Sequence, residues 1–241
     1  MEYKYLGSTG LKVSVIGLGS GVLTDDPAQH EGLKQVVKKA FESGINFFDT
    51  AEMYGYGQSE LALGKAFKEL DLPREQLVVS TKIFWGPGNG PNDNGLSRKH
   101  LIEGTKASLK RLQLDYVDLL FCHKPDYQTP VEETVRAIDF LIQNGWVLYW
   151  GTSEWPVERI MEAHRICEKL GIQKPVVEQP EYNMLNRYKL EKEYLQLFSE
   201  AGLGTTVWSP MAGGVLSGKY NDGIPEGTKF SNTNKDWQAN L

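Results

Sequence analysis

The feature that most constrains this chain is a repeat in which a short apolar segment is followed by an amphipathic helix. β-Branched and aromatic residues dominate the apolar segments, which suits strands buried on both faces of a parallel sheet. The regular repeat favours a closed (β/α)8 TIM barrel over an open doubly wound sheet. We therefore expect an α/β protein with strands at Val13–Gly17, Ile45–Asp49, Leu77–Lys82, Tyr116–His123, Val147–Ser153, Val176–Gln179 and Gly204–Ser209.

Turn and cap residues predict the remaining elements. Lys4–Leu6 and Leu11–Val13 flank a glycine-containing turn, which indicates a small N-terminal β-hairpin. Apolar residues in Glu31–Ser43 fall on one helical stripe. Thr129–Glu132 matches a capping box with proline at the first helical position, and a further helix is expected near Ser97–Leu112.

The spacing also predicts that one repeat is missing. Successive predicted strands begin about 30 residues apart, so an eighth would begin near residue 235 of the 241. Residues 221–241 are instead polar and contain no apolar run. We expect a single domain over residues 1–241 that holds seven of eight strands. The C-terminal β/α unit is then absent, and the chain is interpreted as truncated.

Composition narrows the class of function. The net charge is -5, which disfavours binding to phosphate backbones and so argues against a nucleic-acid partner. No apolar stretch approaches the ~20 residues that cross a bilayer, so no direct membrane insertion is expected. Cys122 and Cys167 lack the spacing of a disulfide framework or a metal site. Together these features predict a cytoplasmic enzyme with no bound metal.

Four residues that can carry chemistry are expected at one rim of the barrel. Asp49, Lys82 and His123 end successive predicted strands, and Tyr54 follows in the loop after Asp49. Active sites of such barrels lie at the C-terminal ends of the strands. An ammonium beside a phenol makes the phenol a better proton donor, and a carboxylate keeps the ammonium charged and oriented. The set predicts reduction of an aldehyde or ketone by an external hydride, with His123 donating a hydrogen bond to the carbonyl oxygen.

Each of these residues also has an ordinary structural explanation. Asp49 could cap the next helix, Lys82 could be a solvated loop lysine, and Tyr54 could be a packed tyrosine with its hydroxyl outward. His123 could be a satisfied loop histidine. Only the joint placement of the four at successive strand ends favours catalysis.

A hydride-carrying cofactor needs partners for its carboxamide and a flat surface for its ring. Ser153 and Gln179 end the fifth and sixth predicted strands and can supply the polar partners. Trp208 in the seventh can supply the surface, although a core position would explain it equally well.

The sequence that begins at Gly17 does not match the dinucleotide-binding fingerprint, because Val22 stands where the third glycine is required.

A glycoside hydrolase is a further alternative. Glu154 and Glu178 lie near the ends of the fifth and sixth predicted strands, and two carboxylates ~5 Å apart would suit retaining hydrolysis. Glu178 directly precedes Gln179, so one of that pair points away from the barrel axis.

Several stretches resemble the aldo-keto reductase family. These are Asp49–Gly55, Ser80–Lys82 and Tyr116–Leu119. Further stretches resemble the β subunits of voltage-gated potassium channels, especially those of the plant type, and they are Thr81–Gly86, Gly95–His100, Tyr149–Trp155 and Glu178–Asn183. Animal channel subunits carry Asn at the position of His123, so this chain retains the full reductase tetrad.

The resemblance implies reduction of aldehydes and ketones by NADPH, which becomes NADP+, with Tyr54 as the proton donor and Asp49, Lys82 and His123 completing the tetrad. In the family the residue at Trp208 stacks on the nicotinamide, and the one at Lys219 lies near the pyrophosphate. The family's last strand and helix, which hold the 2′-phosphate, are not found here. Cofactor-lining positions are matched by Ser20, Ser153, Gln179, Trp208, Ser209, Pro210, Met211, Gly213, Lys219 and Tyr220.

The resemblance also implies two alternatives to a free-standing enzyme. The chain could be a regulatory subunit that binds the cytoplasmic domain of a potassium channel and uses bound NADP(H) as a redox sensor. It would then be membrane-associated through the channel, and because related subunits are tetramers, a homotetramer would be expected. The chain could otherwise be an inactive fragment.

Overall fold

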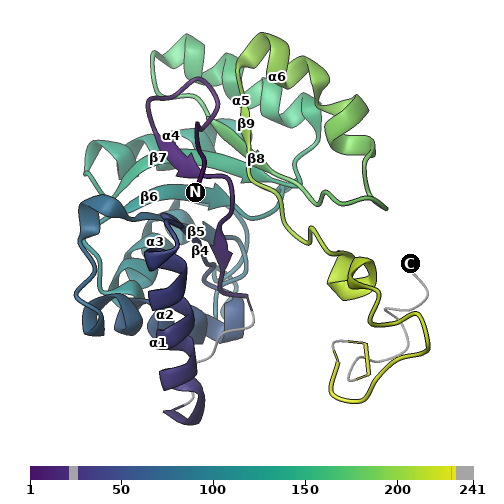
Figure 1. The fold of residues 1–241 in the computed structure, drawn as a ribbon. Helices are drawn as coiled ribbons and strands as arrows, with labels where there is room; N and C mark the ends of the chain where they lie inside the picture. The colour runs from purple at the N-terminus through teal and green to yellow at the C-terminus, as the bar shows by residue number, and fades with distance from the viewer. Residues whose placement is uncertain (22–26, 229, 232–241) are drawn as a thin grey trace.

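The computed structural model describes residues 1–21, 27–228 and 230–231, and the side chains of Pro27–Gln29 are not described. Residues 229 and 232–241 of the polar tail expected at residues 221–241 therefore lie outside the described residues. In the described part, seven parallel strands form one curled sheet in the order β3-β4-β5-β6-β7-β8-β9. Each strand pairs with the next one along the chain, and helices cover the outer face of the sheet (Figure 1).

The strands are short, and those from β4 to β8 begin and end within two residues of the expected apolar segments. They are β3 Leu18–Gly19, β4 Phe47–Asp49, β5 Val78–Ile83, β6 Val117–Cys122, β7 Val147–Ser153, β8 Val177–Gln179 and β9 Gly204–Thr205. Within the described residues β3 and β9 form the two edges of the sheet. The arrangement confirms the predicted (β/α)8 barrel with seven of its eight strands, together with the N-terminal hairpin of β1 (Tyr3–Tyr5) and β2 (Lys12–Ser14).

The helices alternate with the strands, as a parallel sheet requires. They are α1 Pro27–Glu42, α2 Gln58–Glu69, α3 Arg98–Leu112, α4 Val131–Gln143, α5 Val157–Leu170 and α6 Leu195–Ala201. Four short helical turns accompany them, namely η1 Tyr54–Gly57, η2 Arg74–Gln76, η3 Lys189–Glu193 and η4 Ala212–Ser217. The part of the chain that the structure describes contains no helix that is both long and apolar enough to cross a bilayer.

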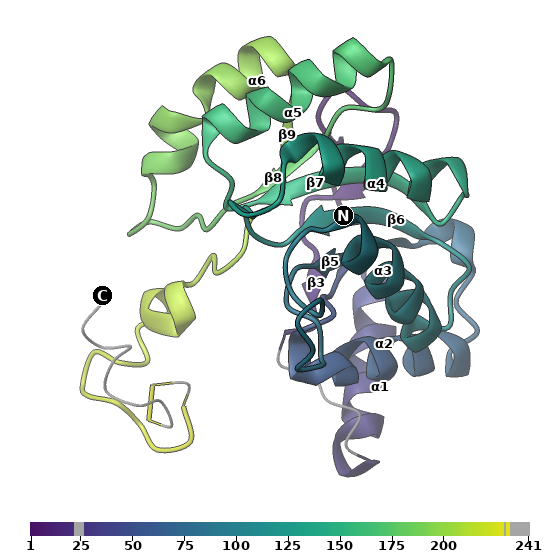
Figure 2. The same cartoon turned by 180° about the vertical axis from the view of Figure 1, so that it is seen from behind.

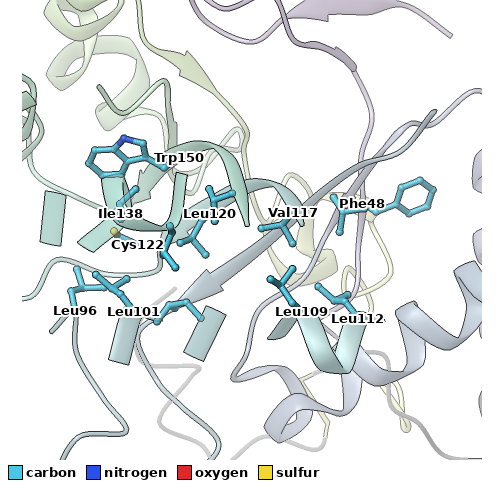
Figure 3. Close-up of a cluster of buried hydrophobic side chains, with 14 of the residues drawn as sticks. Phe48, Leu96, Leu101, Leu109, Leu112, Val117, Leu120, Cys122, Ile138 and Trp150 are labelled. Atoms are coloured by element: carbon cyan, nitrogen blue, oxygen red, sulfur yellow. The ribbon is translucent and has the colours of Figure 1, made fainter. Parts of the chain in front are cut away.

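The main hydrophobic core lies between the helices and the outer face of the sheet. Figure 3 shows part of it, where Leu120 and Cys122 of β6 lie near Ile138 of α4 and Leu101 of α3. A second, smaller core fills the inside of the curled sheet. It consists of the inward residues of the central strands and two residues of the hairpin segment, and its members are Leu6, Val13, Phe47, Val78, Leu119, Phe121 and Val177.

Three local predictions are wrong. The first long strand was expected at Val13–Gly17, but Val13 pairs with Lys4 in the hairpin, and the parallel sheet begins only at β3. Apolar residues alternate with polar ones from Leu11 to Val15 and continue at Ile16 and Leu18, so the pattern does not show where one element ends and the next begins. The seventh strand was expected to reach Ser209 but ends at Thr205, and Trp208 makes only an isolated bridge to Glu181.

The predicted capping box is the third error. Thr129 Oγ1 donates to Asp126 Oδ2 at 2.6 Å instead of capping α4. Pro130 is the N-cap residue and makes no side-chain cap bond. A competing carboxylate three residues earlier therefore takes the hydroxyl that the sequence pattern assigns to the helix.

The contact between α2 and α3 depends on Gly64. A Cβ at this position would lie 2.3 Å from the carbonyl oxygen of Leu112. We expect Gly64→Ala to lower the free energy of unfolding by about 1–3 kcal/mol, because two backbones would have to separate. Gly32→Ala on α1 is the matched control, since nothing lies within 4 Å of its Cβ position, and it should stabilise by about 0.5–1 kcal/mol. Urea denaturation measures both, and equal midpoints would contradict the close packing of the two helices.

Candidate active site

The inner face of the sheet changes character along the strands. Residues near the strand starts, such as Phe47 and Val78, belong to the inner core. Side chains of a strand alternate between faces, so Asp49 follows Phe47 inward, and Ser80 and Lys82 follow Val78. The inner face is therefore apolar at one end of the strands and polar at the other. The polar end is the C-terminal rim at which the sequence places the catalytic candidates.

Lys82 is the centre of this rim and is fully buried. Its Nζ donates to Asp49 Oδ2 at 2.5 Å, to the carbonyl of Thr50 at 2.7 Å and to the Tyr54 hydroxyl at 3.3 Å. An ammonium has three N–H donors, so all three are used. Burial disfavours the charged amine, but the charges of Asp49 and Tyr54 outweigh it and raise the pKa of Lys82. A charged ammonium thus lies against the phenol oxygen.

Asp49 is held in place by a polar ring around the rim. Ser80 Oγ donates to Asp49 Oδ1 at 2.5 Å. Gln179 from β8 reaches the same oxygen at 3.5 Å, and its Nε2 also donates to Thr206 Oγ1 at 3.1 Å. The carboxylate is therefore fixed from two sides while its other oxygen faces Lys82. Ser80 and Thr206 were not singled out from the sequence, although Ser80 lies two residues before Lys82 and so shares its face.

His123 lies beside Tyr54 at the same rim. The two rings meet edge to face with centroids 5.8 Å apart, and Trp85 packs on the other side of the imidazole at 5.1 Å. Burial and the nearby Lys82 and Lys124 lower the pKa of His123 to about 3. The imidazole is therefore neutral and keeps one N–H. Its Nδ1 is buried and has no hydrogen-bond partner among the described residues.

Trp208 lies beyond β9 and is 40% exposed. Its indole N–H donates to Glu154 Oε1 at 3.0 Å. The same oxygen accepts the backbone N–H of Glu181 at 2.6 Å, and the other oxygen pairs with Lys189. Glu154 has a φ of 60°, a strained conformation for a residue with a side chain. Trp208 is thus a partly exposed aromatic surface anchored at its edge by Glu154, a contact that the sequence did not predict.

This geometry overturns the glycoside hydrolase alternative. Glu178 points to the outer face of the sheet, where it accepts from Thr152 Oγ1 at 2.5 Å and from the backbone N–H of Trp155 at 3.2 Å. Burial raises its pKa to about 8. Because Glu154 is already bonded to Trp208 and Lys189, the two carboxylates do not flank a common substrate position.

The other cofactor candidates fall into two groups. Ser153 and Ser20 lie at the rim, where Ser153 Oγ donates to the carbonyl of Gln179 at 2.9 Å. Ser20 Oγ is buried and has no hydrogen-bond partner within the described residues. The second group begins at Ser209, whose carbonyl accepts from Asn183 Nδ2 at 3.1 Å, and comprises Ser209, Pro210, Met211, Gly213, Lys219 and Tyr220.

This second group belongs to η4 and its flanks, which extend away from the sheet beyond β9 (Figures 1 and 2). Ala212, Gly213 and Gly214 have φ values of 47°, 66° and 99° in succession. Lys219 Nζ lies 2.8 Å from the position that a Cβ on Gly214 would occupy. A glycine turn with left-handed φ values beside an ammonium suits a phosphate group. The structure does not bring this segment against the tetrad.

The donor set fits a nicotinamide dinucleotide. Trp208 offers a flat, partly exposed ring, Ser20 offers an unpaired hydroxyl at the rim, and η4 offers a phosphate-type turn. An adenine dinucleotide is long enough to engage separate groups of residues. The polar rim, the aromatic surface and the glycine turn thus satisfy the chemical needs of its different parts.

Comparisons with known proteins agree with this fit. The model of the aldo/keto reductase family matches residues 15–241. The chain is 52% identical over all 241 residues to a protein of Arabidopsis thaliana described as "Probable voltage-gated potassium channel subunit beta", and it covers 73% of that protein. It is 49% identical over 241 residues to a protein of Oryza sativa subsp. japonica with the same description, again covering 73%. The family resemblance inferred from the sequence is confirmed.

The anchoring of Trp208 can be tested without turnover. Glu154→Ala removes the acceptor of the indole N–H, so we expect the emission of Trp208 to shift to longer wavelength and the protein to lose about 1–3 kcal/mol of stability. The Trp208 signal is obtained by subtracting the spectrum of Trp208→Phe in each background. Glu154→Gly relieves the positive φ and should be about 1 kcal/mol more stable than Glu154→Ala, with the same spectral shift. An unshifted spectrum in both variants would rule out the anchoring role.

Proposed function

The chain belongs to the aldo/keto reductase family, and from that premise we propose that it reduces aldehydes and ketones to alcohols with NADPH. The observation that carries the proposal is the contact of a buried, charged Lys82 with the Tyr54 hydroxyl at 3.3 Å. Asp49 keeps the ammonium charged, and the three groups share one rim. This is the arrangement that a proton donor to a carbonyl oxygen requires.

In the proposed reaction the bound cofactor supplies a hydride to the carbonyl carbon, and NADP+ is left. Tyr54 gives its phenol proton to the carbonyl oxygen, so one hydride and one proton together convert the C=O group to an alcohol. The Lys82 ammonium stabilises the phenolate that results, until the phenol regains a proton from solvent. The neutral imidazole of His123 donates a hydrogen bond that orients the carbonyl oxygen next to Tyr54.

We further propose which residues hold the cofactor. Ser153 and Gln179 lie at the rim and would bind the carboxamide, while Trp208 would stack on the nicotinamide ring. The η4 turn and Lys219 would bind the pyrophosphate through backbone N–H groups and the ammonium. The remaining lining positions would be Ser20, Ser209, Pro210, Met211, Gly213 and Tyr220. The choice of NADPH over NADH follows from the family resemblance.

A second function is compatible with the first. The relatives at 52% and 49% identity are described as channel β subunits, and this supports a regulatory role for the present chain. In that role the chain would bind the cytoplasmic domain of a potassium channel as a homotetramer, at the cytoplasmic side of the membrane. In that role the subunit would sense the redox state of the cell through whether it holds NADPH or NADP+. The tetrad would convert one form to the other by reducing a carbonyl substrate.

The proton-donor role of Tyr54 is tested by Tyr54→Phe. We expect kcat for an aromatic aldehyde to fall by about 10²–10⁴, because the only group positioned to protonate the carbonyl is removed. Binding of NADPH, measured by calorimetry, should change little. Tyr56→Phe is the matched control, since Tyr56 is 81% exposed on the same loop and its hydroxyl faces solvent. Equal rates in Tyr54→Phe and the parent chain would remove Tyr54 from its proposed role, and no turnover by the parent would favour the inactive-fragment alternative.

The regulatory role has a separate test. We expect the chain to co-purify with the cytoplasmic domain of a plant voltage-gated potassium channel and to run with it as one complex in sedimentation velocity. Tyr54→Phe should bind equally well, because partner binding does not need the proton donor. Two independent peaks at every mixing ratio would count against the regulatory proposal and leave the reductase proposal intact.

A further inference from the structure

A second cluster of buried ionisable groups lies behind the loop that carries Tyr54. Glu52, two residues before Tyr54, is fully buried. His100 on α3 is only 5% exposed. Its Nε2 lies 3.3 Å from Glu52 Oε1, and its Nδ1 lies 2.8 Å from the carbonyl oxygen of Gly95. The backbone N–H of Glu52 donates to the carbonyl of Lys82 at 3.2 Å, and the proposed reaction uses the side chain of neither Glu52 nor His100.

The hydrogen-bond partners of His100 indicate which of its two ring nitrogens carry a proton. A backbone carbonyl only accepts hydrogen bonds, so the nitrogen facing Gly95 must carry a proton. An ionised carboxylate also only accepts, so the nitrogen facing Glu52 must carry one too. A neutral imidazole would set a lone pair against the carboxylate. An imidazolium therefore fits between these two acceptors when Glu52 is ionised.

The electrostatics agree with this geometry. Burial disfavours the charged ring, but the hydrogen bond and charge of Glu52 outweigh it, with help from the Gly95 carbonyl and Asp93. The pKa of His100 is therefore raised above its usual ~6.5. The ion pair keeps a buried carboxylate compensated, which matters because Glu52 Oε2 has no hydrogen-bond partner among the described residues.

The other charged groups around His100 already have partners or lie at the surface. Together with Glu52, the groups Asp93, Glu103 and Arg111 line a cavity of about 190 Å³ next to the ring. Arg111 Nε pairs with Glu60 of α2 at 2.6 Å. Glu103 pairs with Lys99 on the exposed face of α3, and Asp93 Oδ2 accepts the backbone N–H of Gly90. This leaves His100 as the cation that pairs with Glu52.

The pair joins two loops of the rim. Glu52 Oε1 also accepts the backbone N–H of Phe84 at 2.8 Å, immediately before Trp85, whose ring packs on His123. The Gly95 N–H donates to the Phe84 carbonyl at 2.8 Å and closes the loop between them. His100 thus holds the base of the Trp85 loop through Gly95 and the Tyr54 loop through Glu52.

We propose that His100 and Glu52 are positioning residues, in which a protonated His100 clamps the Tyr54 loop to the Trp85 loop and so fixes the phenol against His123. The effect on turnover rests on the proposed function, whereas the clamp itself does not. A group whose pKa is raised by folding contributes stability fully below its unfolded pKa and loses it as pH rises through the folded value. With Glu52 ionised, the clamp is therefore intact below the ordinary histidine pKa of ~6.5 and weakens as pH rises through the raised pKa of His100.

The variant His100→Gln tests the effect on turnover. We expect kcat for an aromatic aldehyde to fall about 10–100-fold at pH 6, with the KM for NADPH changed less than about twofold, because the phenol is misplaced but still present. We expect kcat of the parent chain to fall as pH rises through the pKa of His100, and this fall should be absent from the pH profile of His100→Gln. His164→Gln is the matched control, since His164 is a buried histidine of α5 away from the rim. A parent-like kcat and pH profile in His100→Gln would overturn the positioning role.

Nitrogen-15 NMR of the imidazoles tests the clamp without turnover. The chain has four histidines, so their ring signals can be assigned one variant at a time. We expect His100 to be doubly protonated at pH 6 and to become neutral in Glu52→Gln, because burial then acts on the imidazolium without the charge of Glu52. His100→Gln should also shift the signals of Tyr54 and the Trp85 indole, and His164→Gln should not. A neutral His100 in the parent chain, or unshifted Tyr54 and Trp85 signals, would overturn the inference even if the chain proved to be an active reductase.

Discussion

The alternation of side chains along buried parallel strands is the constraint on which the rest of this structure depends. In β5, Ser80 and Lys82 point inward while Thr81 and Ile83 face the helices. The outward set packs a hydrophobic layer that stabilises the fold. The inward set is apolar at the strand starts and polar at the strand ends. The two-residue alternation thus assigns outward side chains to packing against the helices, and it leaves the inward side chains at the strand ends free to form a polar site.

The buried lysine gives the rim its electrostatic character. Placing an ammonium out of water is costly, and Lys82 is tolerated because all three of its N–H donors have acceptors. Its ammonium contacts the Tyr54 hydroxyl at 3.3 Å and helps to hold His123 neutral, as the lowered pKa of the imidazole shows. One rim therefore holds a buried cation beside a neutral hydrogen-bond donor.

The sequence predicts those parts of the structure that local patterns determine. The strand ends that carry Asp49, Lys82 and His123 could be found because apolar periodicity and strand-end polarity are both local. The boundary between β2 and β3 was missed because apolar residues recur from Leu11 to Leu18 across both strands. The role of Glu154 was missed because its partner Trp208 is 54 residues away, and no periodicity links the two. The position of η4 away from the sheet likewise has no local signal in the sequence.

The glutamates near the rim show why acidic residues there need not signal hydrolysis. Glu52 accepts the backbone N–H of Phe84, Glu154 that of Glu181, and Glu178 that of Trp155. In each case the carboxylate also meets a second side chain, so it joins a loop to a neighbouring element. A parallel barrel leaves long loops at its rim whose backbone donors must be satisfied, and a buried carboxylate satisfies several at once. These acids therefore hold the loops of the rim in place, and their bonds to backbone donors account for their positions without a catalytic role.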